Sequence, residues 1–222
     1  MKTLFQKYKH AWVLLYFLIY MPWFMWLEKT VVTEYHPVHI KLDDFIPFNE
    51  WFVIPYYLWF AFVAAAIIYL FFTDVKEYYR MMALLCIGMT VCLIIYTVWP
   101  NGQNLRPDLA TLGRENIFTR IVANLYATDT STNVCPSIHV FNSLGVCIGI
   151  FHCSRLRDKK WITIPTLVLT ISICLSTVFL KQHSSFDVIC GIILAAILYV
   201  IVYVPDYEKF FTKRRESVHS AI

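Results

Sequence analysis

Residues 52–72 read FVIPYYLWFAFVAAAIIYLFF and carry no charged side chain. About 20 apolar residues in a helix are enough to cross the hydrocarbon layer of a bilayer. Lipid offers no partner to backbone polar groups, so a spanning segment of this kind satisfies them internally as a helix. The stretch therefore predicts a membrane-spanning helix rather than the core of a soluble domain.

Five further apolar stretches accompany this one. The chain has 222 residues, of which 59% are hydrophobic and 15% charged, whereas soluble domains average about 25% charged residues. The fourth and sixth stretches are short, so we expect their helices to begin about one turn earlier, in the preceding polar sequence. The prediction is an all-α, polytopic membrane protein with six transmembrane helices in a single domain, 1–222. The expected spans are 11–27, 52–72, 81–99, 138–153, 161–180 and 188–204.

Positive charge is distributed unevenly between the two sets of loops. One set holds 13 of the 19 Lys and Arg residues, and the other holds 6. We expect the protein in the plasma membrane. Because cytoplasmic loops carry the excess of Lys and Arg, we expect both termini to face the cytoplasm and the other set of loops to face outward. Residues 205–222 then form a basic cytoplasmic tail. The basic set comprises residues 1–10, 73–80, 154–160 and 205–222.

Three polar motifs fall in the other set of loops. In WPNGQNLRPDL (99–109), Arg106 offers a planar fork that suits phosphate oxygens, although it also suits an interfacial anchor. In CPSIH (135–139), Ser137 is a good N-cap, so His139 is either a functional group or simply a polar residue in a first turn. Both motifs lie next to predicted spans on the outward-facing side.

The third motif is FLKQHSSFDVICG, residues 179–191. His183 and Asp187 are spaced i,i+4, so we expect them on one helix face. A carboxylate there can bind one imidazole nitrogen and leave the other free to attack, although an interfacial ion pair explains the same spacing. Lys181 lies two residues earlier. Two helix N-termini, which attract anions, would meet these side chains in one outward-facing phosphate pocket.

The order Arg-Pro, Pro-Ser-x-His and His-x-x-x-Asp resembles the integral-membrane branch of the type 2 phosphatidic acid phosphatase superfamily. The resemblance covers about residues 80–204, which would be the catalytic core. It implies that His183 attacks phosphorus to form a phosphohistidine, that Asp187 orients His183, and that His139 protonates the leaving oxygen. It also implies that Arg106 and Ser137 hold the phosphoryl oxygens, with no metal and no other cofactor.

Three positions depart from the family pattern. The family has a Lys where this chain has Trp99, an Arg at Thr177 and a Gly at Ile138. We expect Lys181 to replace one missing cation as a substrate ligand. The departures, together with CPSIH and KQH, resemble the sphingomyelin and inositol-phosphorylceramide synthase relatives, which transfer a phosphoryl headgroup between lipids.

Three functions follow from these observations. The first is a lipid phosphatase, whose partners are a phosphorylated lipid and the bilayer rather than nucleic acid. The second is a phosphotransferase with an alcohol acceptor. The third is a transporter or scaffold, which the near absence of mid-span charge disfavours.

Two further patterns concern structure. Residues 116–126 carry apolar side chains at helical spacing and predict an interfacial helix in an outer loop. Gly145 and Gly149 form a GxxxG pattern that predicts close helix packing within the bundle.

Overall fold

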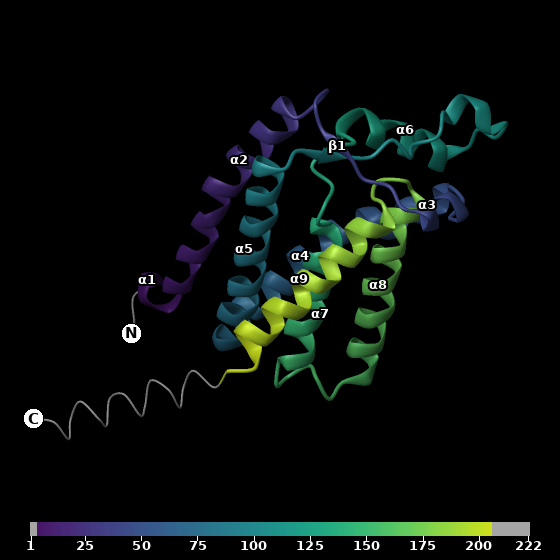
Figure 1. The fold of residues 1–222 in the computed structure, drawn as a ribbon. Helices are drawn as coiled ribbons and strands as arrows, with labels where there is room; N and C mark the ends of the chain where they lie inside the picture. The colour runs from purple at the N-terminus through teal and green to yellow at the C-terminus, as the bar shows by residue number, and fades with distance from the viewer. Residues whose placement is uncertain (1–3, 206–222) are drawn as a thin grey trace, which may run out of the picture.

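The computed structural model describes residues 4–205, which form a bundle of helices with a layer of loops and short helices at one end (Figure 1). Six helices run along the bundle. They are α2 (Phe17–Thr30), α4 (Val53–Thr73), α5 (Val75–Val98), α7 (Ile138–His152), α8 (Lys160–Phe179) and α9 (Ser185–Tyr203).

The remaining elements are short. A four-residue helix, α1 (Leu4–Lys7), and a 3₁₀ helix, η1 (Lys9–Tyr16), precede α2. Strands β1 (His36–Pro37) and β2 (Asn101–Gly102) pair in parallel. The others are α3 (Lys41–Phe45), η2 (Glu50–Phe52), η3 (Leu109–Leu112) and α6 (Ile117–Thr128).

The prediction of an all-α polytopic membrane protein is confirmed. Five helical segments within the described residues are long and apolar enough to cross a membrane. The remaining expected span, 138–153, is observed as α7, which has 15 residues and is therefore about 22 Å long, shorter than the roughly 30 Å hydrocarbon layer. α7 packs against α4, α5, α8 and α9 and so lies at the centre of the bundle. The five segments are Lys9–Thr30, Glu50–Thr73, Val75–Val98, Lys160–Phe179 and Ser185–Tyr203.

The expected early helix starts are observed in one case and not in the other. α9 begins at Ser185, three residues before the predicted apolar stretch at 188. α7 begins at Ile138, so the predicted extension of the fourth span is wrong. The reason is local: Ser137 has extended backbone angles and caps the helix with its side chain, which accepts from the Val140 N–H.

The two glycines of α7 lie against α5. A Cβ atom on Gly145 would come within 2.7 Å of the Leu85 side chain, and one on Gly149 within 2.8 Å of Met81. Both contacts are shorter than packed atoms tolerate, so a larger residue at either position would force the Leu85 or Met81 side chain to move. The predicted close packing is thus confirmed.

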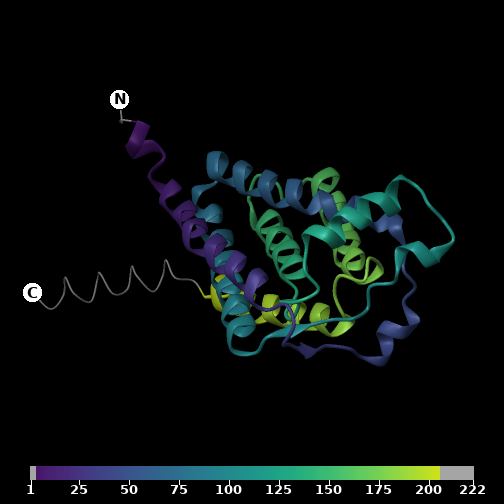
Figure 2. The same cartoon turned by 90° about the horizontal axis from the view of Figure 1, so that it is seen from above.

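The layer of loops covers the end of the bundle where α7 and α9 begin (Figures 1 and 2). We call this the loop end. Both ends of the described chain lie at the opposite end (Figure 1). Residues 206–222 of the tail predicted at 205–222 lie outside the described residues. The helix predicted at 116–126 is observed as α6, which lies across the loop end and is capped by the Asn116 side chain.

Candidate active site

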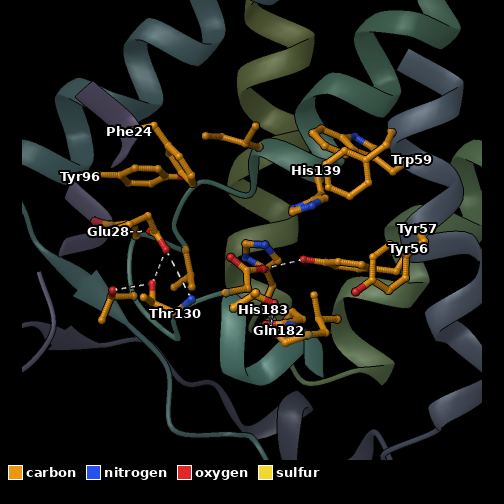
Figure 3. Close-up of a pocket in the computed structure, with 18 of the residues that line it drawn as sticks. Phe24, Glu28, Tyr56, Tyr57, Trp59, Tyr96, Thr130, His139, Gln182 and His183 are labelled. Atoms are coloured by element: carbon orange, nitrogen blue, oxygen red, sulfur yellow. Dashed lines mark hydrogen bonds between the residues drawn. The ribbon is translucent and has the colours of Figure 1, made fainter. Parts of the chain in front are cut away.

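A cavity of about 370 Å³ lies at the loop end. Its walls come from α2, α4, α5, α6 and the start of α7, together with the loops around residues 129–134 and 182–183. His139 and His183 both line it and face each other across its centre (Figure 3), with their ring centroids 5.8 Å apart. The structure therefore brings together two histidines that are 44 positions apart in the sequence.

The end of α8 aims His183 at the cavity. Lys181 has a positive φ of 53°, and its N–H donates to the Val178 carbonyl while the Gln182 N–H donates to the Thr177 carbonyl. This is the Schellman ending of a helix, in which the left-handed position is usually glycine. The His183 N–H also donates to the Thr177 carbonyl, at 3.0 Å. The backbone of His183 is therefore fixed by the helix that precedes it.

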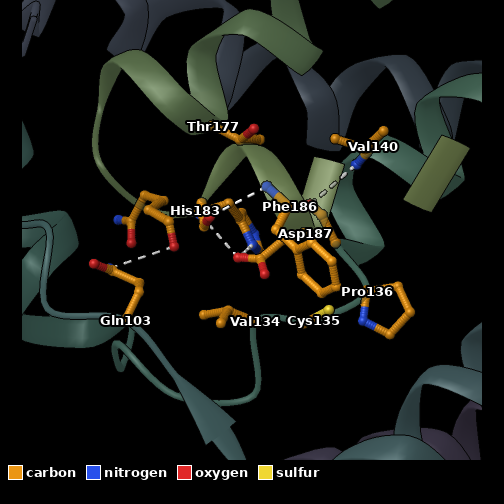
Figure 4. Close-up of polar contacts among 12 residues, drawn as sticks. Gln103, Val134, Cys135, Pro136, Val140, Thr177, His183, Phe186 and Asp187 are labelled. Carbon is orange, nitrogen blue, oxygen red and sulfur yellow. Dashed lines mark hydrogen bonds and ion pairs between the residues drawn. The ribbon is translucent and has the colours of Figure 1, made fainter. Parts of the chain in front are cut away.

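Asp187 supports His183 from the start of α9. Ser184 caps α9, and its own N–H donates to Asp187 Oδ2 at 2.9 Å, which completes a capping box. The same oxygen lies 3.4 Å from His183 Nδ1 (Figure 4). His183 precedes the helix, so the predicted shared helix face is wrong. The pair forms because the cap folds His183 back over the first turn.

His139 lies in the first turn of α7, beside two aromatic rings of α4. Its ring centroid is 4.7 Å from that of Tyr56 and 4.5 Å from that of Trp59. Ser137 is fully buried, and its N–H donates to the Asp187 carbonyl at 3.1 Å. This hydrogen bond joins the start of α7 to the first turn of α9, and it thereby fixes the position of His139 relative to that of His183.

Arg106 binds protein oxygens rather than lining the cavity. Its guanidinium donates to the carbonyls of Asp129 (2.9 Å) and Thr130 (2.7 Å) and to Gln182 Oε1 (2.5 Å), and it stacks on the Tyr126 ring. It thereby fixes the loop that carries Thr130 and the residue next to His183. Direct binding of phosphate by Arg106 stays a prediction, and it would require some of these hydrogen bonds to be exchanged.

Lys181 is also engaged away from the cavity. Its buried ammonium donates to the Asp43 carbonyl at 2.8 Å. The Asp43 carboxylate in turn accepts from Ser184 Oγ (2.6 Å) and from the Ser185 N–H (2.7 Å). The short helix α3 therefore clamps the turn that presents His183. The role of Lys181 as a substrate ligand likewise stays a prediction.

We expect Asp43→Asn to lower the melting temperature by about 5 °C at pH 7, because hydrogen bonds to a charged group contribute more than neutral ones. Burial of Asp43 opposes its ionisation, but the hydrogen bonds from Ser184, Ile40 and Ser185 outweigh burial and lower its pKa. A lowered pKa stabilises the fold above the unfolded value of about 4. The stabilisation is lost as the pH falls through the lower folded value.

Thermal unfolding followed from pH 7 to pH 3 tests this expectation. The difference between Asp43→Asn and the parent should narrow as the pH falls. Asp44→Asn is the matched control, because Asp44 is exposed and bonded only to His39 among the contacts of the described chain. Equal melting temperatures at pH 7 for the parent and Asp43→Asn would contradict the clamp.

Besides His183 Nδ1, two N–H donors of cavity-lining residues have no hydrogen-bond partner within the described residues. They are Gln182 Nε2 and Trp59 Nε1. The Gln182 amide is oriented by Arg106, which can only donate and therefore faces Oε1. Unpaired buried donors are costly, so both are ready to bind an anion. The sequence motifs indicate a role for neither residue, and the position of Gln182 next to His183 is the one available signal.

Residues 101–210 match the model of the PAP2 superfamily. This range contains all six residues that the sequence motifs singled out. With the apolar helices, the match assigns the protein to membrane enzymes of the phosphatase and phosphotransferase type that act on lipids. The chain belongs to the PAP2 superfamily. No curated protein and no solved structure matches it.

Proposed function

We propose that the protein is a lipid phosphatase that hydrolyses a lipid phosphate through a phosphohistidine intermediate. The observation that carries this proposal is the facing pair of His139 and His183 across one cavity, with Asp187 Oδ2 at 3.4 Å from His183 Nδ1. The carboxylate of Asp187 lies close to Nδ1 of the His183 imidazole, and we propose that the other ring nitrogen, Nε2, faces the substrate. The other imidazole, His139, lines the same cavity, and we propose that it protonates the leaving oxygen.

In the first step, His183 Nε2 attacks phosphorus. The N–P bond forms, the bond from phosphorus to the lipid oxygen breaks, and His139 gives its proton to that oxygen. Asp187 stabilises the positive charge that develops on the His183 ring. A phosphate bound between the two rings favours the proton on His139, because an adjacent anion stabilises an imidazolium.

In the second step, water attacks the phosphorus of phosphohistidine. Neutral His139 takes a proton from this water, the N–P bond breaks, and its electron pair returns to His183 Nε2. Inorganic phosphate leaves, and both histidines regain their starting protonation states. Gln182 Nε2 and Trp59 Nε1 supply hydrogen bonds to the phosphoryl oxygens in both steps.

A phosphotransferase is the second candidate. No Lys or Arg occurs among the cavity-lining residues of the described chain, and the family's Arg position is Thr177, whose carbonyl is used by the backbone of Gln182 and His183. Such a wall favours a singly charged phosphodiester over a doubly charged monoester. In this case, a second alcohol replaces water in the second step and a new phosphodiester lipid forms.

The proposed location is the plasma membrane, with the termini in the cytoplasm and the cavity at the extracytoplasmic face. The distribution of Lys and Arg supports this orientation. A cysteine introduced at Thr111, an exposed residue at the loop end, should react with a membrane-impermeant maleimide on intact cells. Labelling only after permeabilisation would reverse the orientation.

The test of function is incubation of the purified protein with lipid phosphates and phosphodiester lipids, with and without long-chain alcohol acceptors. Release of free phosphate identifies a phosphatase, and a new phosphodiester lipid identifies a phosphotransferase. Absence of both products with every substrate would reject the proposal.

We expect Asp187→Asn to lower kcat by about 10²–10⁴-fold, by analogy with other carboxylates that orient a catalytic histidine. The amide cannot stabilise the positive ring, although it can still occupy the space. Because Asp187 also caps α9, the measurement pairs initial rates with a melting curve. A variant that melts like the parent and keeps its kcat would remove Asp187 from the mechanism.

A further inference from the structure

The cavity wall carries negative charge on one side. Glu28 and Asp129 both line it, and among residues 4–205 no basic Lys or Arg side chain does. An all-anionic ligand such as a simple phosphomonoester would meet two carboxylates in a confined space. The negative charge of the wall therefore favours a ligand that carries a positively charged group.

Glu28 is the carboxylate available to such a charge. Its Oε2 accepts from Thr130 Oγ1 at 2.6 Å, and its Oε1 accepts from Asn133 Nδ2 at 2.9 Å (Figure 3). Both donors are neutral, so they hold the carboxylate in place without cancelling its charge. None of the ion pairs within the described part of the chain includes Glu28.

Asp129 differs from Glu28 in this respect. Its Oδ2 accepts from the Tyr56 hydroxyl at 3.0 Å, and the Arg106 guanidinium donates to its backbone carbonyl. A positive group thus lies behind Asp129 and offsets its charge. The charge of Arg106 acts on both carboxylates, but more strongly on Asp129 than on Glu28, so Glu28 is the less neutralised of the two.

Asn133 gives a second, independent indication. Its side chain lines the cavity and is 6% exposed, and its Oδ1 has no hydrogen-bond partner. The orientation of this amide is fixed, because Nδ2 must face the carboxylate of Glu28. A buried acceptor without a donor is costly, and an ammonium N–H would satisfy it.

Aromatic rings complete this side of the cavity. Tyr20, Phe24 and Glu28 lie four residues apart on one face of α2, and the Tyr96 ring of α5 also lines the wall. Figure 3 shows Phe24 and Tyr96 on the side of Glu28, away from Tyr56, Tyr57 and Trp59. Aromatic faces attract ammonium and quaternary ammonium groups, and a carboxylate beside them adds to the attraction.

The opposite side has the reverse character. Gln182 Nε2 and Trp59 Nε1 are unpaired donors there, next to the two histidines. The cavity is thus built for a ligand with an anionic and a cationic end. We infer that the substrate carries a positively charged nitrogen close to its phosphoryl group, bound by Glu28, Asn133 and the rings of Phe24 and Tyr96. This inference rests on the proposed function and specifies its substrate class.

The nitrogen can belong to either part of the lipid. An amino group on the lipid backbone beside a phosphomonoester has this chemistry, and so does a choline or ethanolamine headgroup in a phosphodiester. One pair of probes is a 2-amino-1-alkyl phosphate against the alkyl phosphate of equal length. The other is phosphatidylcholine against phosphatidylglycerol with equal acyl chains.

The full-length protein in detergent is assayed for kcat/KM on each pair. We expect the ammonium-bearing member of at least one pair to be preferred by about tenfold or more. Glu28→Gln should reduce that preference about tenfold, because kcat/KM on the ammonium-bearing member loses the attraction to the carboxylate and falls further than kcat/KM on the ammonium-free member. Glu28→Asp, which keeps the charge, should retain part of the preference.

The ratio within a pair separates recognition from folding, since a general loss of structure lowers both rates together. Glu34→Gln is the control, because Glu34 is exposed and does not line the cavity. Equal cleavage of both members of each pair by the parent would overturn the inference and leave the proposed function standing. An equal fall on both members in Glu28→Gln would also overturn it. Absence of cleavage of all four probes would reject the proposed function and the inference with it.

Discussion

His183→Ala should release no phosphate above background from any lipid that the parent protein cleaves. Removal of a catalytic nucleophile costs about 10⁶-fold in well-studied hydrolases, because no other group in the site can form the covalent intermediate. Here the proposed nucleophile is held through its backbone by the Thr177 carbonyl, and its ring Nδ1 lies 3.4 Å from Asp187 Oδ2. Water has no comparable support, so direct hydrolysis should not replace the lost step.

Detection of the phosphohistidine intermediate tests the role of His183 more directly than phosphate release does. The parent, mixed with a lipid labelled in its phosphate and quenched rapidly, should carry label that is stable to alkali and released by acid, as expected of a nitrogen–phosphorus bond. His183→Ala should carry none. His39→Ala is the matched control, because His39 is exposed in the loop before α3 and bonds only to Asp44 among the described contacts. Labelling of His183→Ala at the level of the parent would assign the nucleophile elsewhere.

The bundle could be predicted because each long helix is indicated by a run of apolar residues in its own sequence. An uncharged run such as 52–72 has few alternatives in lipid, and α4 spans Val53–Thr73. The starts of α7 and α9 were harder, since a cap is decided by single side chains. The Ser137 cap makes α7 begin at Ile138, whereas the capping box of Ser184 and Asp187 makes α9 begin at Ser185, before its apolar stretch.

The roles of the two cations show where sequence motifs become ambiguous. From the sequence alone, the Arg of an Arg-Pro pair and a Lys two residues before a histidine are both compatible with phosphate binding. In the folded protein, Arg106 meets the carbonyls of Asp129 and Thr130, and Lys181 meets that of Asp43. These partners lie 23, 24 and 138 positions away, so no local pattern could indicate them.

The character of the cavity could not be predicted for the same reason. Glu28 ends the first span, Trp59 sits within the second, and Asn133 precedes the fourth, and each has an ordinary explanation in its own segment. They form one site only when the helices pack and bring these three side chains to the wall of the same cavity. The donor side and the acceptor side of that space are properties of the tertiary structure alone.

His139→Ala should lower kcat on an alkyl phosphate by about 10⁴-fold, at the upper end of general acid–base effects. His139 acts in both steps of the proposed mechanism, first as the acid for the lipid oxygen and then as the base for water. The two roles can be separated by the leaving group. A p-nitrophenyl phosphate needs no proton to depart, so its first step does not depend on His139.

With this substrate, rapid-mixing experiments on His139→Ala should show a burst of p-nitrophenol close to one equivalent, followed by slow turnover as the phosphohistidine waits for water. The burst is expected because the imidazole of His183 and its support from Asp187 are unchanged. His183→Ala should give no burst with the same substrate. If His139→Ala instead lost equal factors on the alkyl and aryl substrates and gave no burst, His139 would be a structural neighbour of Tyr56 and Trp59 rather than the acid. The 5.8 Å between the two rings would then reflect packing at the loop end.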